Sequence, residues 1–192
     1  MMDDLLYCYP GSDVLKNKLG IKDQEKLREV ERKLTALRIS DLIRKPVKGS
    51  FDLAHLCMIH FYIFQDLYTW AGELRKVDIS KGNMFCRVIY LPAQAETVLG
   101  AIRRENWMKG LDRESFIRRM AYHFSELNAL HPFREGNGRA QREFVRELAL
   151  YNGYAVDFIK AEPDEMLNAS VDSFLCKYDK MEVLFDKCLR KL

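Results

Sequence analysis

The chain has 192 residues, of which 48% are hydrophobic and 31% are charged, with 10 glycines and 5 prolines. This composition is typical of a globular protein with one sizeable core, and it excludes disordered, collagen-like and low-complexity chains. Because 31 basic residues against 28 acidic ones leave a net charge of only +3, the charge does not indicate a nucleic-acid-binding protein, and we expect no direct nucleic-acid binding.

The predicted elements are mostly helices, and no repeat or linker divides residues 1–192, so we expect a single domain. Residues 1–20 contain a Tyr-Pro-Gly-Ser turn signal and are expected to be irregular. Hydrophobic residues at helical spacing predict a helix over 23–42 and a second one over 52–68. The buried face of the second helix is predicted to carry Leu56, Ile59 and Ile63.

A change of pattern over 74–91 predicts a β-hairpin. Residues 74–79 alternate between hydrophobic and polar, residues 80–83 form a Ser-Lys-Gly-Asn turn, and residues 87–91 are rich in β-branched and aromatic side chains. The domain is therefore expected to be mainly α-helical, with this hairpin as its one β element.

Helical spacing returns after the hairpin. We expect a helix from Pro92 to about Met108, a helix over 112–130 that Asp112 caps, and a helix that follows residue 138 and ends at an Asn-Gly pair, residues 152–153. Residues 163–192 are expected to form one or two further helices. The hydrophobic faces of the second and third of these helices are predicted to contain Phe116, Met120, Phe124 and Leu127, and Phe144, Val145 and Leu148.

The connection HPFREGNGRAQR, residues 131–142, concentrates residue types that handle phosphate. Its Gly-Asn-Gly sequence lets the backbone approach a ligand closely and opens into a helix, whose N-terminal N–H groups and dipole favour phosphate. Arg139 and Arg142 lie on one face of that helix, and guanidinium groups suit phosphate oxygens. Glu135 is a possible ligand for Mg²⁺, and His131 can accept a proton near neutral pH.

Each of these features has a simpler interpretation when it is taken alone. A Gly-Asn-Gly sequence is usually only a turn, and a histidine at a helix end is more often a cap or a surface residue. Two arginines in a first turn more often pair with acidic residues, here Glu143 or Glu147. The combination of these features within one short connection favours a phosphate-handling site. The histidines at 55, 60 and 123 lack the spacing of a metal site and are interpreted as structural.

The connection resembles the Fic motif, HxFx(D/E)GNGRxxR, at every specified position. The Tyr-Pro-Gly of residues 9–11, the YTWAGELR of residues 68–75 and the Ser-Lys-Gly of residues 80–82 are similar to further signatures of that family. The resemblance implies a Fic-type helical bundle with a β-hairpin flap, here over about 74–91.

The same resemblance implies a protein adenylyltransferase, which transfers AMP from ATP to a hydroxyl side chain of a target protein and releases pyrophosphate. His131 would be the general base, Glu135 would bind Mg²⁺, and Arg142 would hold the γ-phosphate. The residues implied at the α- and β-phosphates are Gly136, Asn137, Gly138 and Arg139. The flap would align the target, which would add a strand to its edge.

Three residues outside this connection are further candidates for ATP binding. Lys81, at the tip of the expected flap, would contact nucleotide phosphate or the target, with a solvated turn lysine as the equal alternative. Asn128 and Asn168 are expected to contact adenosine, against the ordinary interpretation of asparagines on a helix surface.

Two other functions are compatible with the sequence. A Fic-fold kinase, or another nucleotidyl or phosphoryl transferase, would use the same fold, although the intact Gly-Asn-Gly-Arg favours AMP transfer. A catalytically silent module that only binds nucleotide or protein is disfavoured by the presence of both His131 and Glu135.

Many Fic enzymes are restrained by a helix of sequence (S/T)xxxE(G/N), whose glutamate pairs with the second arginine of the motif. Here Thr69 is followed by a glutamate four positions later, but Leu74 stands where Gly or Asn is required. We therefore expect a separate small antitoxin that carries such a helix and directs a glutamate at Arg142, with this chain as the toxin. The resemblance suggests a type II topoisomerase subunit as the target.

The sequence predicts a cytoplasmic bacterial protein. No hydrophobic run approaches the roughly 20 residues of a membrane helix, and the acidic Met-Met-Asp-Asp start is unlike a signal peptide, so we expect no membrane association. The five scattered cysteines contain no CxxC pair and indicate a reducing compartment. A translocated effector that acts in a host cell is the alternative.

Overall fold

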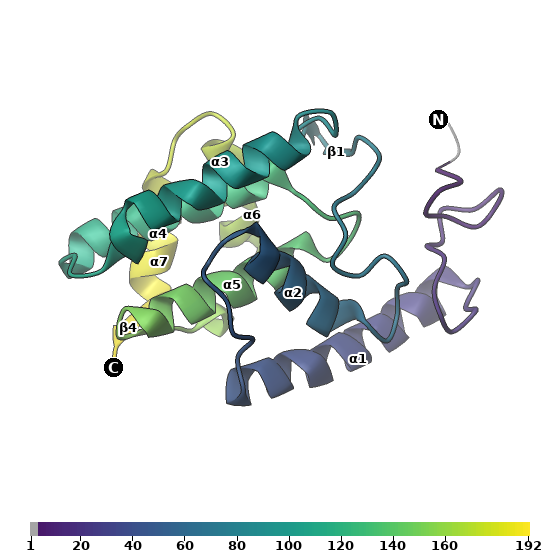
Figure 1. Ribbon diagram of the computed structural model, residues 1–192, viewed down its shortest axis with the longest axis horizontal. Helices are drawn as coiled ribbons and strands as arrows, with labels where there is room; N and C mark the ends of the chain where they lie inside the picture. Colours follow the sequence, from purple (N-terminus) through teal and green to yellow (C-terminus); the bar gives the residue numbers. More distant parts are fainter. Residues whose placement is uncertain (1–3) are drawn as a thin grey trace.

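The computed structural model describes residues 4–192 and contains, within that range, seven α-helices and two small antiparallel sheets. In Figure 1, α1 (Gln24–Arg44) and α3 (Leu91–Arg104) lie on opposite sides of the molecule, with α2 (Leu53–Phe64) and α5 (Asn137–Tyr151) between them. The N-terminal segment and the C-terminus lie at opposite ends. The predicted mainly α-helical fold is confirmed.

Aspartate caps fix the starts of three helices where the sequence predicts them. The carboxylates of Asp23, Asp52 and Asp112 accept hydrogen bonds from backbone N–H groups in the first turns of α1, α2 and α4 (Arg113–Leu130). Helix α2 ends at Phe64 rather than at Tyr68, and in the turn that follows the N–H groups of Leu67 and Tyr68 both bond the carbonyl of Phe64.

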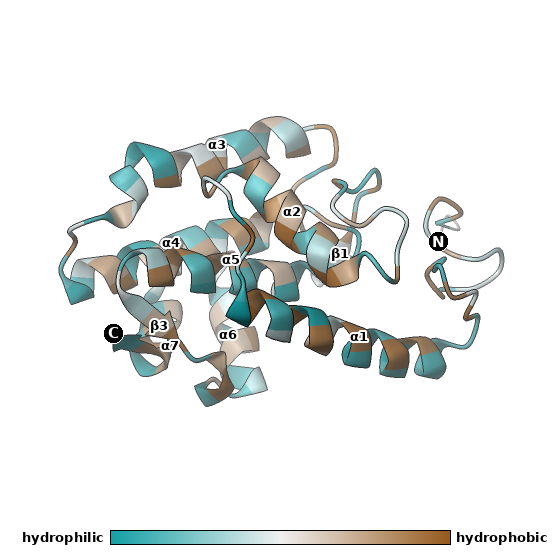
Figure 2. Ribbon diagram, turned by 60° about the horizontal axis from the view of Figure 1, so that its bottom comes forward, coloured by the Kyte–Doolittle hydropathy of each residue, from teal (hydrophilic) through white to brown (hydrophobic). Residues whose placement is uncertain are grey.

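Helix α2, of sequence LAHLCMIHFYIF, is the most hydrophobic helix of the bundle, and much of its ribbon is brown in Figure 2. It packs against both α1 and α5, so most of its circumference is covered. Helix α1 alternates between hydrophobic and hydrophilic residues because only one of its faces meets the rest of the protein. The connection between α4 and α5 packs on helix α2.

The predicted hairpin is much shorter in the structure. Strand β1 (Ser80–Lys81) pairs with β2 (Asn83–Met84) around Gly82, which has φ +78°. The residues predicted as the second strand, 87–91, form a turn that leads into α3 at Leu91. The prediction is correct for the tip of the flap and wrong for its length.

Polar side chains take the place of the missing strand ladder. The carboxylate of Asp78 accepts a hydrogen bond from the N–H of Val88 at 2.6 Å, and the guanidinium of Arg75 donates to the carbonyls of Val77 and Cys86. These bonds satisfy backbone groups that a longer hairpin would pair with each other. A pattern of alternating hydrophobic residues does not show that side-chain hydrogen bonds replace the backbone bonds of a longer hairpin.

The C-terminal part contains two helices, where one or two were expected, and one sheet that was not expected. Helix α5 ends at the predicted Asn-Gly pair, and α6 (Pro163–Ser173) and α7 (Asp179–Cys188) follow. Strand β3 (Tyr154–Val156) pairs antiparallel with β4 (Leu189–Lys191), which places the C-terminus beside the end of α5. Two short 3₁₀ turns, Asn106–Met108 and Phe158–Lys160, complete the described elements.

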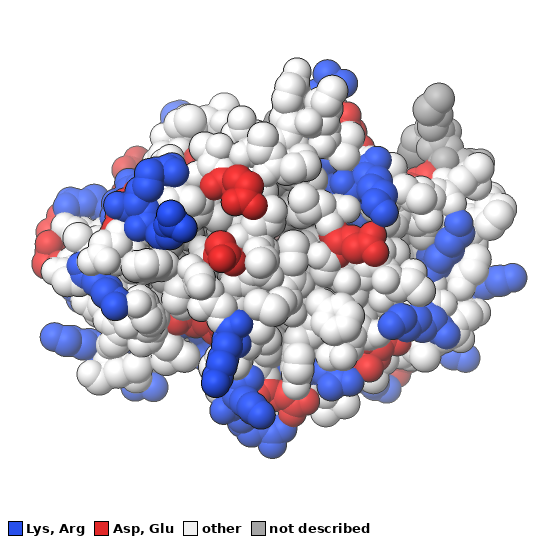
Figure 3. Space-filling model, in the orientation of Figure 1, with Lys and Arg blue, Asp and Glu red and all other residues white. Residues whose placement is uncertain are grey.

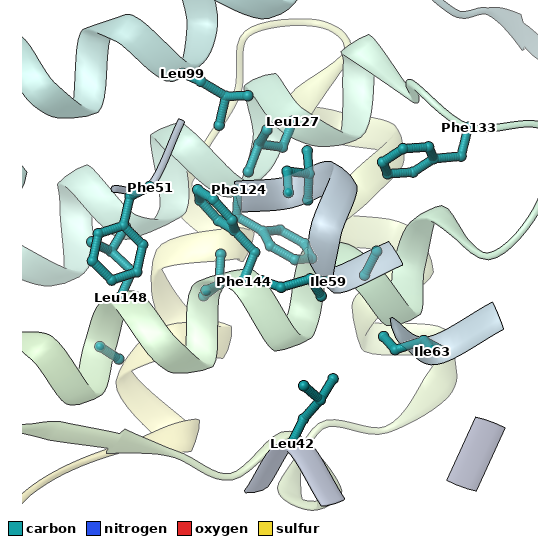
Figure 4. Packing of buried hydrophobic residues seen from close by; sticks show 14 of the residues in the cluster. Leu42, Phe51, Ile59, Ile63, Leu99, Phe124, Leu127, Phe133, Phe144 and Leu148 are labelled. Carbon is teal, nitrogen blue, oxygen red and sulfur yellow. The ribbon is translucent and has the colours of Figure 1, made fainter. Parts of the chain in front are cut away.

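The main hydrophobic core fixes the two helices that flank the connection. Figure 4 shows side chains of α2, α4 and α5, among them Ile59, Phe124, Leu127 and Phe144, packed together. Each buried side chain of this size contributes about 1.5–3 kcal/mol relative to an exposed one. All of the predicted face residues of these three helices are buried: Leu56, Ile59, Ile63, Phe116, Met120, Phe124, Leu127, Phe144, Val145 and Leu148.

The surface carries basic and acidic side chains that are interspersed on the face shown in Figure 3. This distribution agrees with the small net charge of +3. Among residues 4–192, no helix is both long and hydrophobic enough to cross a membrane.

Candidate active site

The connection between α4 and α5 begins and ends at residues with positive φ. His131 closes α4 with φ 47° and ψ 62°, and Gly136 precedes α5 with φ 79°. Helix α5 starts at Asn137, within the Gly-Asn-Gly sequence rather than after it. A Cβ at Gly136 would lie 2.1 Å from the ring of Phe64, so this position requires glycine for space as well as for conformation.

A groove of about 1070 Å³ lies over the start of α5. It is lined by residues of the connection, by residues 76–81 with Phe85 and Val88, and by residues of the N-terminal segment between Asp4 and Asp13. The volume suits a ligand of nucleotide size. The predicted site residues that line it are Lys81, Asn128, His131, Glu135, Asn137 and Gly138.

His131 is oriented as a proton acceptor. Its Nδ1 lies 3.3 Å from the carbonyl oxygen of Asn128, which can only accept, so Nδ1 carries the proton and the lone pair is on Nε2. Burial, together with the nearby charge of Lys81, lowers the pKa of His131 to about 4. The ring is therefore neutral near pH 7 and can accept a proton at Nε2.

Glu135 lies at the start of α5, next to the groove. Its Oε1 accepts a hydrogen bond from the N–H of Gly136 at 2.8 Å and lies 3.5 Å from Nη2 of Arg139. No group of three or more His, Cys, Asp or Glu side chains that could hold a metal is found in the described part of the chain. Mg²⁺ is commonly held by one or two carboxylates, water and substrate phosphates, so the single carboxylate of Glu135 fits Mg²⁺ that arrives with a nucleotide.

Asn137 contributes to the site through its backbone. Its side chain accepts from the N–H of Phe133 at 2.8 Å and donates to the carbonyl of Phe133 at 2.7 Å, so it closes the loop. The first N–H groups of a helix have no partner within the helix. The backbone N–H groups of Asn137 and Gly138 are therefore the groups that can bind an anion.

The two motif arginines have different surroundings. The guanidinium of Arg139 pairs with Glu31 on α1, lies 3.2 Å from Oγ1 of Thr35 and stacks over Phe64. Arg142 lies against Gly138, and no carboxylate pairs with it among residues 4–192. Burial and the charge of Arg139 lower the pKa of Arg142. Arg142 is thus the motif cation without an ionic partner, and it favours an anionic ligand.

The remaining candidates lie in different places. Lys81 is exposed in the tip of the flap, on the wall of the groove, and its charge reaches His131. Asn128 lines the same groove. Asn168 is exposed on α6 and lines a separate groove with residues of α6 and α7, so the structure does not bring it to the motif.

His60 bonds the backbone of the connection and packs against it, and no sequence pattern identified this role. Its Nδ1 accepts from the N–H of Gly72 at 2.8 Å, so Nε2 carries the proton and donates to the carbonyl of Glu135 at 3.0 Å. The ring stacks on Phe133 with centroids 3.8 Å apart. Burial lowers the pKa of His60 to about 4, so the ring is neutral near pH 7 and this tautomer is maintained. The interpretation of His60 as a structural histidine agrees with this geometry.

Arg134, at a position that the motif leaves unspecified, binds the N-terminal segment. Nε of Arg134 lies 2.7 Å from Oδ2 of Asp4, and the guanidinium stacks over Tyr7. The hydroxyl of Tyr7 accepts from the N–H of Lys76 at 3.0 Å, so the same segment also reaches the flap. The sequence does not predict these contacts, because they join parts of the chain that are far apart in sequence.

Comparisons with known proteins decide the family. A model of the Fic/DOC family matches residues 50–149, which include the motif and the flap. This chain belongs to the Fic/DOC family. The Fic relative of Salmonella typhimurium, a probable protein adenylyltransferase, is 36% identical over 185 residues, which cover 95% of this chain and 91% of the relative.

Further relatives of this Fic chain come from Bartonella. Protein adenylyltransferase VbhT of Bartonella schoenbuchensis is 42% identical over 95% of this chain, which spans only 38% of VbhT. The crystal structure of BepC from Bartonella tribocorum, with bound AMPPNP, has a TM-score of 0.93, 27% identity and full coverage of both chains. The Fic domain of a Bep effector from Bartonella quintana, with bound ADP, has a TM-score of 0.92 and 30% identity, and covers 97% of this chain and 95% of that one.

Proposed function

We propose that this Fic chain is a protein adenylyltransferase, which transfers AMP from ATP to a hydroxyl side chain of a target protein. The observation that carries the proposal is the neutral His131, whose Nε2 makes no hydrogen bond within residues 4–192 and which lines the same groove as Asn137 and Gly138 at the start of α5. The names of the relatives, probable or established protein adenylyltransferases, support the same reaction.

In the proposed reaction, Nε2 of His131 accepts the proton of the target hydroxyl while its oxygen attacks the α-phosphorus of ATP. The bond between the α-phosphorus and the bridging oxygen breaks, and pyrophosphate leaves with that electron pair. The proton stays on His131 until water or product removes it. Such a transfer depends mainly on positioning and charge neutralisation, so one general base is sufficient.

The phosphates would be bound at the start of α5. Backbone N–H groups of Asn137 and Gly138 would hold the α- and β-phosphates, and Arg142 would pair with the γ-phosphate. Glu135 would hold Mg²⁺, which would neutralise phosphate charge. Arg139 would act mainly through its bridge to Glu31, which fixes the start of α5 against α1.

The reaction can be tested with ATP labelled at the α- or the γ-phosphate and a bacterial lysate. Label transferred from the α-position alone supports AMP transfer. Label transferred from the γ-position alone indicates a kinase, and no label from either position indicates a binding module. A purified type II topoisomerase subunit is the first individual target to assay.

We also propose that the enzyme is the toxin of a toxin–antitoxin pair in the bacterial cytoplasm. Arg142 supports this: no carboxylate among residues 4–192 pairs with it, so a glutamate from an antitoxin helix would find a half-buried cation there and would compete with the γ-phosphate. A synthetic (S/T)xxxE(G/N) helix should inhibit transfer, while the same peptide with Glu→Gln should not. Equal inhibition by both peptides would contradict the pairing.

A further inference from the structure

Arg75, in the segment that resembles a family signature, is a buried cation that belongs to no assigned site. It is 2% exposed. The nearest carboxylate oxygen among the described ion pairs is Oδ1 of Asp78, 3.9 Å from Nη1. A buried charge is costly unless hydrogen bonds satisfy it. The bonds that Arg75 makes therefore indicate what this charge stabilises.

The guanidinium of Arg75 donates to backbone carbonyls on two sides. On the side of the motif, Nε lies 2.9 Å from the carbonyl oxygen of His131 and Nη2 lies 3.4 Å from that of Leu130. On the side of the flap, Nη1 lies 2.9 Å from the carbonyl oxygen of Val77, and Nη2 also bonds that of Cys86. One side chain thus joins the base of the flap to the end of α4.

The backbone of His131 needs such support. Its φ of 47° is the left-handed conformation, which is unfavourable for residues that carry a Cβ. Such conformations persist where surrounding contacts hold them, and they are frequent at active sites. The bond from Nε of Arg75 to the carbonyl of His131, together with the bond from the N–H of Arg75 to the carbonyl of Pro132 at 2.9 Å, holds two successive carbonyls of this turn.

The flap carbonyl that Arg75 binds lies next to the residue that covers His131. Phe85 precedes Cys86, and its ring lies on the imidazole of His131 with centroids 3.8 Å apart and planes at 16°. Both backbones that carry these rings are therefore bonded to the same guanidinium. We propose that Arg75 is a positioning residue that holds Phe85 and His131 together, and so fixes how the His131 ring faces the groove.

A lysine cannot replace this arrangement. A guanidinium is a planar fork whose N–H groups reach several carbonyls at fixed angles, whereas an ammonium is a single compact charge on a flexible stem. Arg75→Lys keeps the charge but is expected to release either the flap or the turn at His131. Arg146→Lys is the matched control, because Arg146 is also mostly buried and bonds a backbone carbonyl, that of Leu42, away from the groove.

The structural test is the NMR signal of the His131 ring, assigned with a His131→Asn variant. The stacked ring of Phe85 should shift the ring protons of His131 upfield in the wild type and in Arg146→Lys. In Arg75→Lys this shift should be largely lost. An unchanged His131 signal in folded Arg75→Lys would overturn the proposal, and this readout does not depend on the proposed reaction.

The kinetic test rests on the proposed AMP transfer. A misplaced base of this kind costs about 10²-fold in rate, so kcat should fall by that factor in Arg75→Lys while the Kd for ATP stays near the wild-type value. An equal loss in Arg146→Lys, or a loss confined to ATP affinity, would overturn the positioning role. If the wild type transfers no AMP, the proposed function fails and the NMR test still decides the role of Arg75.

A measurement on the wild type covers the case in which Arg75→Lys does not fold. The Nε–H of Arg75 should exchange slowly with solvent, because it is buried and bonded to His131. Arg28, whose side chain is 67% exposed and pairs with Glu25 through Nη1, gives the exchange rate of an Nε–H on the protein surface. Equal exchange rates at the two residues would overturn the proposal.

Discussion

The imidazole of His131 lies nearly parallel to the ring of Phe85, with centroids 3.8 Å apart and an angle of 16° between the planes. Because Phe85 belongs to the flap segment, the same element that would align the target also removes water from one face of the base. This cover contributes to the burial that lowers the pKa of His131 to about 4. The flap therefore affects both the placement and the proton affinity of the base.

The first prediction concerns the pH dependence of transfer. Lowering the pKa of His131 favours the neutral form, so protonation of this ring should reduce the rate only as the pH falls toward about 4. Phe85→Leu exposes the ring and raises its pKa toward the ordinary value of about 6.5. The acid limb of kcat should move to higher pH in this variant. An acid limb at the same pH in both proteins would show that Phe85 does not control the base.

The second prediction compares two glycines with the same backbone conformation, of which only one has a neighbour too close for a Cβ. Gly136 and Gly153 both have φ +79°, but a Cβ at Gly136 would meet the ring of Phe64 at 2.1 Å and a Cβ at Gly153 would meet nothing within 4 Å. Gly153→Ala should cost about 1–2 kcal/mol from the left-handed conformation alone. Gly136→Ala should lower the free energy of unfolding, measured in urea, by clearly more. Equal losses would contradict the close packing of the loop on Phe64.

The third prediction concerns the γ-phosphate. Arg142→Gln should weaken ATP binding by about 10- to 100-fold, the worth of a hydrogen bond to a charged group, and should leave the Kd for ADP nearly unchanged. Arg146→Gln, on the same helix but paired with Glu143, should alter neither constant. Calorimetric titration with both nucleotides measures these constants. A parallel loss of ATP and ADP affinity in Arg142→Gln would place Arg142 elsewhere than at the γ-phosphate.

The fourth prediction concerns metal. Glu135 is the carboxylate of the motif that lines the groove, so transfer should require Mg²⁺, and Glu135→Gln should raise the Mg²⁺ concentration needed for half-maximal rate. Metal titrations of the wild type and the variant, with ATP held constant, measure this change. Full wild-type activity in excess chelator would show that Glu135 has another role.

The helices and the place of the motif at the start of α5 could be predicted from the sequence because both are local. Asp23, Asp52 and Asp112 cap helices within one turn of themselves, and the motif is contiguous in sequence. The length of the hairpin could not be predicted, because side chains of Arg75 and Asp78 bind the carbonyl and N–H groups that a ladder would use. The pairing of β3 with β4 joins two three-residue segments at the ends of a long connection, which no local pattern reveals.

Within the motif, too, the sequence does not predict contacts of the two arginines with residues that are far away in the chain. Their spacing predicts that Arg139 and Arg142 share a face, but it does not show that Glu31, on a distant helix, pairs with Arg139. Likewise, an asparagine at 168 is an ordinary helix-surface residue by sequence, and its place in a groove between α6 and α7 depends on how those helices pack.

In the proposed reaction, His131 activates a target hydroxyl for attack on the α-phosphorus. The most direct measurement is the mass of a modified target peptide after incubation with ATP and either the wild type or His131→Ala. We predict that the wild type adds one AMP to a Ser, Thr or Tyr. We also predict that His131→Ala binds ATP normally and modifies the peptide at least about 10²–10⁴-fold more slowly. A mass increase of one phosphate in place of AMP, or near wild-type modification by His131→Ala, would contradict the proposed reaction.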